Sequence, residues 1–221
     1  TTLPGLHGPV LFLDAGANAD CRAEHLLEFA VLGTAYALAV LGHAHPRVGL
    51  LNIGEEPSKG DELALAAHAL LAASRLDFVG NLEGRDLLQN KAEVVVTDGF
   101  TGNVALKLLE GCASAIFTRV KEAAAGSQRA KMGGMLLRPA LRGLRASLDP
   151  EAYGGTYLLG VRGLVVICHG NSSRHAIANA LRFGADALDR GVLEAVEAEV
   201  AGILGDMGAA RADAAQESPA S

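Results

Sequence analysis

The hydrophobic positions of this chain form short apolar runs that alternate with longer segments rich in Ala and Leu. Residues 8–14 form a continuous apolar run of strand length, typical of a strand buried on both faces. Residues 62–74 begin after Asp61 and have the composition of a helix. Strands that alternate with helices indicate βαβ units and a mostly parallel sheet covered by helices. The predicted strands are 8–14, 47–53, 76–80, 92–97 and 158–167, and the predicted helices are 24–41, 62–74 and 174–204.

A long helical region at 102–147 departs from this alternation. Gly126, the pair Gly133–Gly134 and Pro139 predict breaks in it, because glycine and proline are poor residues for a helix interior. A region of this length with internal breaks favours a helical hairpin, at about 104–147, that projects from the sheet.

The 221 residues are half hydrophobic but only 4% aromatic, and none is Trp, so the core must consist mainly of Ala, Leu and Val. This length suits one large α/β domain. From 206 onward, Ala, Asp, Ser and Pro dominate, as in a frayed tail. We therefore predict a three-layer, mostly parallel, Rossmann-like α/β domain over 1–205, followed by a disordered tail at 206–221.

The charge and the cysteines narrow the functional classes. A formal net charge of -6 argues against a nucleic-acid-binding protein, which needs many Lys and Arg residues for phosphate contacts. Three widely spaced cysteines without a CxxC pair indicate a reducing cytoplasm, and we expect them to be buried and inert.

The longest uncharged apolar stretch, 29–42, is shorter than a membrane span. The first residues resemble no signal peptide, and because Thr1 is not Met we expect a longer parent chain.

Three polar loops follow predicted strands, and in a parallel sheet such loops meet at one edge. After strand 92–97, a carboxylate and two glycines precede a helix start, where free backbone N–H groups favour an anion; a well-capped turn without a ligand remains the alternative. The loop after strand 47–53 carries Lys59, a compact cation suited to phosphate, although it is also readable as an ordinary solvated loop. The third loop contains Asp14 and Asn18, which either line the same crevice or cap the turn.

His169 follows the predicted strand 158–167, and it is either a general acid, an oxyanion donor or a structural histidine. His43 and His45 lack further ligands nearby in sequence, so we expect neither a metal nor a cofactor.

An ordered set of motifs resembles the PlsX phosphate acyltransferase family over nearly the whole chain, from about Gly8 to Leu204. In sequence order the motifs are DAGAN, GLLNIGEE…KG.E, DFVGNLEGRD, VVVTDGFTGNVALK, YGG…LLGV and VV…HG.S. The resemblance implies a fold related to the phosphotransacetylase and isopropylmalate dehydrogenase type. It also implies conversion of acyl-acyl-carrier-protein and inorganic phosphate to acyl phosphate in bacterial phospholipid synthesis. It further implies a homodimer in which the hairpins pack together.

The sequence departs from the family pattern in two ways, and both bear on whether these 221 residues are active by themselves. Family members carry an additional N-terminal third with a DAMGGD-like loop, which this sequence does not contain. Pro57 also stands in the Lys59 loop, where a less rigid residue is expected.

For this reaction we expect Lys59 and the turn 99–103 to hold phosphate. Asn103 or His169 would stabilise the oxyanion, and Asp98 would hold the turn. The expected substrate-binding residues are Asp14, Asn18, Asn52, Glu55, Gly99, Thr101, Gly102 and Lys107. The alternatives are a phosphate acetyl- or butyryltransferase that uses coenzyme A, and a non-catalytic, membrane-docked scaffold for lipid-synthesis enzymes.

A basic apolar segment, 128–142, is expected at the corner of the hairpin, where the helices break, and it predicts contact with a membrane. Met135, Leu136, Leu137 and Arg138 lie at its centre, where apolar side chains can enter the acyl boundary while basic ones meet anionic lipid. Burial of this corner against a partner subunit is the alternative. We expect a cytoplasmic, peripherally membrane-associated protein whose labile product passes to a downstream membrane acyltransferase.

Overall fold

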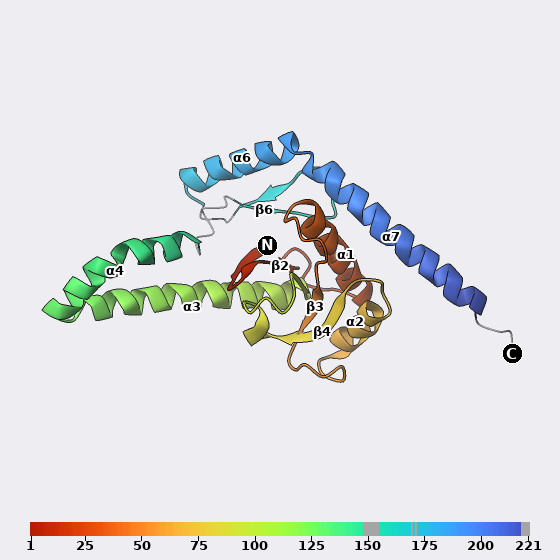
Figure 1. Ribbon diagram of the computed structural model, residues 1–221, viewed down its shortest axis with the longest axis horizontal. Coiled ribbons are helices and arrows are strands. Elements are labelled where there is room, and N and C mark those ends of the chain that lie inside the picture. Colours follow the sequence, from red (N-terminus) through yellow and green to blue (C-terminus); the bar gives the residue numbers. More distant parts are fainter. Residues whose placement is uncertain (148–154, 169, 171, 218–221) are drawn as a thin grey trace.

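A five-stranded sheet in the order β1-β2-β5-β3-β4 forms the centre of the computed structural model (Figure 1). The structure describes residues 1–147, 155–168, 170 and 172–217. Only β1 runs antiparallel to its neighbour, and the other four strands are parallel. The predicted α/β fold with a mostly parallel sheet is therefore confirmed. The strands are β1 (Thr2–Gly5), β2 (Gly8–Leu13), β3 (Val48–Asn52), β4 (Phe78–Glu83) and β5 (Val94–Val96).

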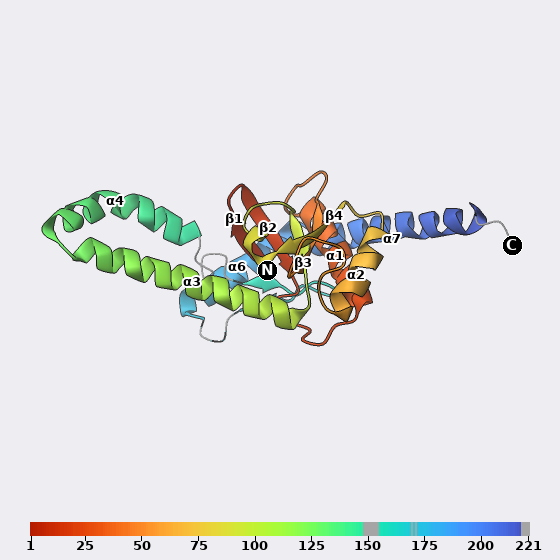
Figure 2. The same ribbon diagram turned by 90° about the horizontal axis from the view of Figure 1, so that it is seen from below.

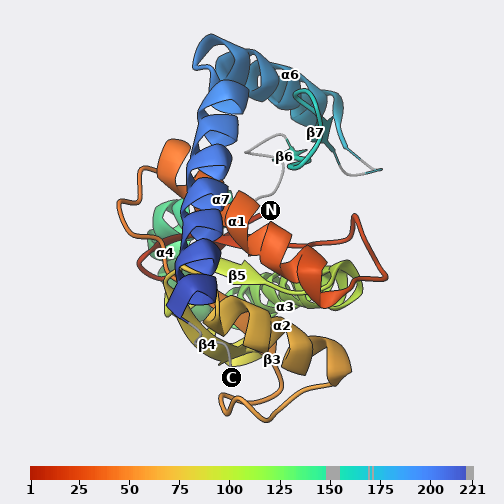
Figure 3. The ribbon, with the colours of Figure 1, turned by 90° about the vertical axis from the view of Figure 1, so that its right-hand side faces the viewer.

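Alternate residues of the strands enter two separate cores, as the two-residue period of a strand requires. Leu11 and Leu13 of β2 face α1 (Ala23–Ala39) and belong to the larger core, which also includes residues of α2 (Glu62–Ala72). Val10 and Phe12 face the other side, where the first turns of α3 (Gly99–Ala125) pack. α7 (Val192–Glu217) crosses α1 and packs against it on the first face (Figure 3). Helices thus cover both faces of the sheet.

α3 and α4 (Gln128–Ser147) form the hairpin, which projects from the sheet with α4 folded back along α3 (Figure 2). The predicted break at Gly126 is confirmed. The breaks predicted at Gly133–Gly134 and Pro139 are wrong, because α4 is continuous through them. A Cβ atom on Gly134 would lie 2.9 Å from the Cβ of Ala124, so this glycine lets the two helices approach. Pro139 removes one backbone donor, and the helix continues past it.

The C-terminal part departs from the predicted pattern in three places. Residues 158–167 were expected to form one strand, but only β6 (Thr156–Tyr157) and β7 (Val166–Ile167) pair, as a separate antiparallel sheet. The predicted helix 174–204 is divided into α6 (Arg174–Asp189) and α7, because Gly191 adopts a φ of 60° that ends the first helix. α7 then continues to Glu217, into the stretch expected to be a frayed tail.

Candidate active site

The loops that follow β2, β5, β3 and β4 lie at one edge of the sheet, because these four strands are parallel. β5 lies between β2 and β3, so the turn at 97–103 is flanked by the loop 14–18 on one side and the loop 53–60 on the other. The sequence predicted these three loops to share an edge, and the strand order places them there.

Asp14, which is 9% exposed, organises the loop that follows β2. Its Oδ1 accepts hydrogen bonds from the backbone N–H groups of Gly16 and Ala17 at 2.9 and 2.8 Å. Its Oδ2 accepts from the backbone N–H of Asn18 at 2.7 Å and from the side-chain Nδ2 of Asn18 at 2.9 Å. Four donors therefore hold this carboxylate, which shapes the loop and keeps Asn18 beside it.

The N-terminus of α3 is joined to this loop by two hydrogen bonds. The backbone N–H of Gly99 donates to the carbonyl of Asn18 at 2.9 Å, and Nδ2 of Asn103 donates to the carbonyl of Ala15 at 3.1 Å. Gly102 is buried against the backbone carbonyl of Asp14, where a Cβ atom would clash. The glycines of this turn thus permit close contact between two backbones.

The first turn of α3 has fewer free donors than the sequence predicted. Asp98 caps the helix, because its Oδ1 accepts from the N–H of Thr101 at 2.8 Å and its carbonyl accepts from the N–H of Gly102 at 2.9 Å. With Gly99 bonded to Asn18, only the N–H of Phe100 in this turn has no partner within the described part of the chain. An anion at this helix end would also need side-chain donors, and the exposed Thr101 and Asn103 are placed to supply them.

Lys59 lies on a loop whose backbone is well anchored. Its N–H donates to the carbonyl of Glu56 at 3.0 Å, and its own carbonyl accepts from Nδ2 of Asn52 at 3.0 Å. Its side chain is exposed, and its ammonium group has no ion pair or hydrogen bond among the residues that the structure describes. Glu55, on the same loop, pairs with Nζ of Lys91 at 2.8 Å. Asn52 and Glu55 therefore both make contacts that hold the loop in place.

Three other residues were singled out from the sequence, and the structure describes two of them, Lys107 and Cys21. Lys107 forms an ion pair of 2.7 Å with Glu110 on the next turn of α3. Cys21 donates to the carbonyl of Asn18, and burial together with the carboxylates of Asp14 and Asp98 raises the pKa of its thiol. This thiol is therefore a poor nucleophile at neutral pH. His169 lies outside the described residues.

The predicted membrane-contact residues lie in the middle of α4, not at the hairpin corner. Leu136 is 83% exposed, and Met135 and Leu137 are also exposed. α4 contains Arg129, Lys131, Arg138, Arg142 and Arg145 but no Asp or Glu. Among the described helices, none is long and apolar enough to cross a membrane.

The side chains on and after β4 that contact the Lys59 loop and hold it in place were not identified from the sequence. Asn81 of β4 is buried and contacts both His68 of α2 and the loop backbone, while Lys91 joins Glu55 to the buried Asp86. Asn81 and Asp86 belong to the motif GNLEGRD; the strand predicted at 76–80 was expected to end before Asn81, whereas β4 continues to Glu83. The available signal was an amide inside an otherwise apolar strand, since buried polar groups are normally hydrogen-bonded.

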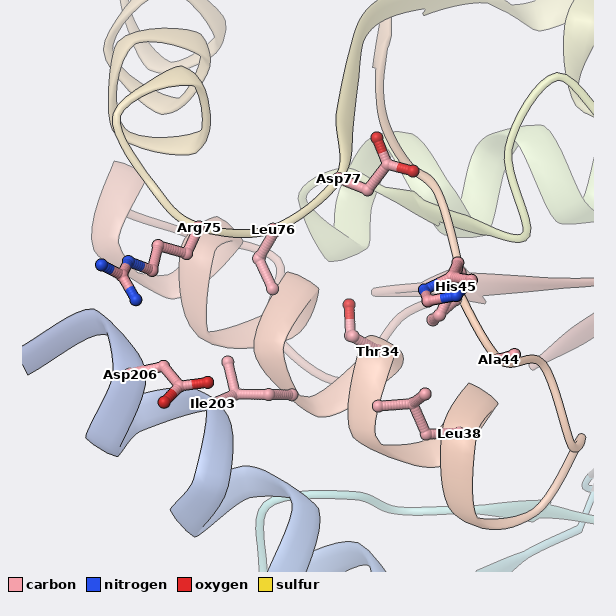
Figure 4. A pocket seen from close by; sticks show the side chains of 10 residues that line it. Thr34, Leu38, Ala44, His45, Arg75, Leu76, Asp77, Ile203 and Asp206 are labelled. Carbon is pink, nitrogen blue, oxygen red and sulfur yellow. The ribbon is translucent and has the colours of Figure 1, made fainter. Parts of the chain in front are cut away.

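Two pockets adjoin the sheet at opposite ends. A shallow pocket of about 360 Å³ lies beside the Lys59 loop and is lined by Glu55, Glu56, Glu83 and Arg85. A larger one, of about 560 Å³, lies between α1 and α7 (Figure 4). Its lining includes Pro46, just before β3, and Asp77, just before β4, so it lies at the amino ends of the strands, away from the candidate site.

Comparison with known proteins places most of this chain in one family. The family described as "Fatty acid synthesis protein" matches residues 1–195. Curated proteins named phosphate acyltransferase are similar to it: that of Moorella thermoacetica is 48% identical over 89% of this chain, and that of Heliobacterium modesticaldum is 47% identical over 91%. The phosphate acyltransferase of Thermodesulfovibrio yellowstonii is 48% identical over 82% of the chain. The aligned part spans 58%, 60% and 53% of these three relatives, so the chain matches little more than half of their length.

Proposed function

This chain belongs to the fatty acid synthesis protein family, and from that premise we propose that it forms the larger part of a phosphate acyltransferase. The proposed reaction transfers an acyl group from an acyl-carrier-protein thioester to inorganic phosphate. The products are acyl phosphate and the free thiol of the carrier protein. In a bacterial cytoplasm this reaction supplies activated acyl groups for phospholipid synthesis.

The chemistry requires a nucleophile held in line with a thioester carbonyl. A phosphate oxygen attacks the carbonyl carbon, and the resulting tetrahedral intermediate carries an oxyanion. When the intermediate collapses, the C–S bond breaks and the electron pair leaves with sulfur as a thiolate, which then takes a proton. The thiolate is a good leaving group, so the step needs orientation and oxyanion stabilisation more than a covalent enzyme intermediate. Orientation alone contributes as much as about 7–11 kcal/mol in favourable systems.

Within this scheme the residues at the start of α3, Lys59 and Asp14 have defined tasks. Lys59, with the N–H of Phe100 and the hydroxyl of Thr101, holds the phosphate. The second N–H of the Asn103 amide, the one not bonded to Ala15, is a donor for the oxyanion; His169 is the alternative donor. Asp98 and Asp14 hold the two turns in place, because their carboxylates accept hydrogen bonds from backbone N–H groups of those turns.

The observation that best supports the proposal is the joining of loop 14–18 to the start of α3. Two loops separated by about 80 residues meet through the Asn18–Gly99 and Asn103–Ala15 hydrogen bonds. Buried glycines at this junction bring backbone against backbone and leave a helix N-terminus at the sheet edge. An exposed lysine, whose ammonium group has no partner in the described part of the chain, follows the adjacent strand.

A thiol-release assay tests the proposal and separates it from its alternatives. Full-length protein should release thiol from acyl-acyl-carrier-protein only when phosphate is present, and much more slowly from acyl-coenzyme A. A preference for acetyl- or butyryl-coenzyme A would favour the coenzyme A-dependent transferase. The absence of release from either thioester would favour the non-catalytic scaffold. The same assay on these 221 residues shows whether they are active alone.

We propose further that the hairpin carries a membrane contact and a dimer interface. α4 combines exposed Met135, Leu136 and Leu137 with five cationic residues, which suits a shallow position at an anionic lipid surface. α3 also exposes Val104, Leu108 and Ile116, whose burial against a second copy is favourable. A homodimer at a membrane surface would release labile acyl phosphate beside a downstream membrane acyltransferase.

A further inference from the structure

The turn that carries Lys59 is held from beneath by the buried side chain of Asn81. Asn81 lies on β4 and is only 4% exposed. Its Nδ2 donates to the carbonyl of Glu56 at 2.8 Å, and its Oδ1 lies 3.0 Å from Nδ1 of His68. Both ends of this amide therefore have partners, one on α2 and one on the loop.

The hydrogen bonds of Asn81 determine which atom donates and which accepts at both of its partners, the Glu56 carbonyl and Nδ1 of His68. The Glu56 carbonyl can only accept, so the NH₂ end of the amide must point to the loop and its oxygen to His68. His68 therefore carries its proton on Nδ1 and donates to Asn81. The ring of His68 is itself held edge-on against Phe78, with ring centroids 5.1 Å apart. The result is a chain of contacts from Phe78 through His68 and Asn81 to the Glu56 carbonyl.

The Glu56 carbonyl connects this chain directly to Lys59. The same oxygen that accepts from Asn81 also accepts from the N–H of Lys59 at 3.0 Å. Loss of the Asn81 donor would leave the turn 56–59 tethered to the rest of the described chain at its two ends. One end is the Asn52–Lys59 bond, and the other is the exposed ion pair between Glu55 and Lys91.

We propose that Asn81 and His68 are positioning residues that set the placement of Lys59 at the candidate phosphate site. Neither residue lies where it would touch phosphate, since both act beneath the loop through the Glu56 carbonyl. The inference rests on the proposed role of Lys59 as a phosphate ligand. A displaced Lys59 weakens the hold on phosphate while the thioester contacts, on other loops, stay unchanged.

The test uses full-length protein with Asn81→Asp, an isosteric change that keeps the acceptor for His68 and replaces the donor to Glu56 with a repelling oxygen. His68→Phe keeps the ring contact but removes the Nδ1 donor. His68→Asn places an amide donor near the position of Nδ1 and serves as the rescue variant. We expect Asn81→Asp and His68→Phe to raise KM for phosphate by about tenfold, with little change in KM for the thioester. His68→Asn should recover most of the loss.

Hydrogen–deuterium exchange of the backbone at 53–60 gives a second measurement that does not depend on activity. Exchange at 53–60 should accelerate at least about tenfold in Asn81→Asp, while exchange in α3 stays as in the parent protein. Unchanged exchange in the loop and an unchanged KM for phosphate in both Asn81→Asp and His68→Phe would overturn the inference. An equal rise in both KM values, not relieved by His68→Asn, would also overturn it, because that pattern indicates general loosening. A parent protein without phosphate-dependent activity would refute the proposed function. Faster loop exchange in Asn81→Asp would in that case still support the role of the Asn81–Glu56 hydrogen bond in holding the loop.

Discussion

The side-chain amide of Asn103 donates a hydrogen bond of 3.1 Å to the carbonyl oxygen of Ala15, across 88 residues of sequence. It joins the second turn of α3 to the loop after β2, beside the buried contact between Gly102 and the Asp14 backbone. The amide retains a second N–H for a ligand. Asn103 is thus both a structural link and a candidate donor, and experiments on it must separate the two.

The first prediction concerns Lys59 and Asn103 as ligand-binding groups. In full-length protein, Lys59→Ala and Asn103→Ala should each lower kcat/KM by about 100-fold, the usual effect of removing one preorganised donor or charge. Steady-state kinetics with phosphate as the varied substrate measures this. Lys121→Ala is the matched control, since Lys121 is another exposed lysine, on α3 outside the site. Wild-type kinetics in both variants, with unchanged phosphate dependence, would remove these residues from the mechanism.

The second prediction concerns the contact between α3 and the Asp14 loop. Gly102→Ala places a methyl group against the Asp14 carbonyl and should destabilise the chain by about 1–3 kcal/mol through overpacking. Gly111→Ala is the control on the same helix, because no atom outside the adjoining helix backbone lies within 4 Å of its added Cβ. That variant should gain as much as about 1 kcal/mol from helix propensity. Urea unfolding of both variants checks the pair, and equal stabilities would show that Gly102 does not pack closely against the Asp14 backbone.

The third prediction concerns the cysteines, whose expected burial is wrong: Cys112 is exposed, and Cys21 and Cys168 are only partly buried. A raised pKa means that less of the Cys21 thiol is ionised at a given pH, so iodoacetamide should label exposed Cys112 faster than Cys21 at about pH 8. Replacement of Cys21, Cys112 and Cys168 together by Ser should leave acyl transfer largely unaffected. An acyl–cysteine adduct trapped by mass spectrometry would contradict this prediction.

The sequence predicted most of the sheet because its strands are short apolar runs separated by polar loops. It also predicted where the site loops meet, since parallel strands direct their carboxyl ends to one edge. Asp98 was expected to hold the turn, and the structure gives it two bonds of a helix cap. These features depend on local pattern and on simple rules of topology.

The failures occurred where a distant contact decides the outcome. Gly134 does not break α4, because its missing side chain accommodates Ala124 of α3. Residues 158–167 are a local exception: Gly160 and Gly163 adopt positive φ in a turn, and the N–H of Leu158 donates to the carbonyl of Val165, so the chain folds back instead of forming one long strand. The sequence placed an anion at the start of α3, but it could not show that Asn18 already occupies the N–H of Gly99.

The fourth prediction concerns the lipid surface. Leu136→Glu combined with Leu137→Glu should abolish sedimentation with anionic liposomes, because each change removes an exposed apolar side chain and adds repulsion. Turnover of a soluble substrate should remain near that of the parent protein. Leu181→Glu with Leu188→Glu on α6 is the matched control, since those leucines are 71% and 69% exposed on a different helix. Co-sedimentation of the α4 variant equal to that of the parent, at low and moderate salt, would mean that α4 is not the contact.

The central claim is that this sheet edge transfers an acyl group to phosphate, and product analysis tests it most directly. Full-length protein is incubated with acyl-acyl-carrier-protein and phosphate labelled with heavy oxygen, and the products are read by mass spectrometry. The account predicts acyl phosphate that carries the label, formed together with one equivalent of free carrier-protein thiol, and loss of both products in Lys59→Ala. Release of free fatty acid without labelled acyl phosphate, or thiol release that persists without phosphate, would contradict it.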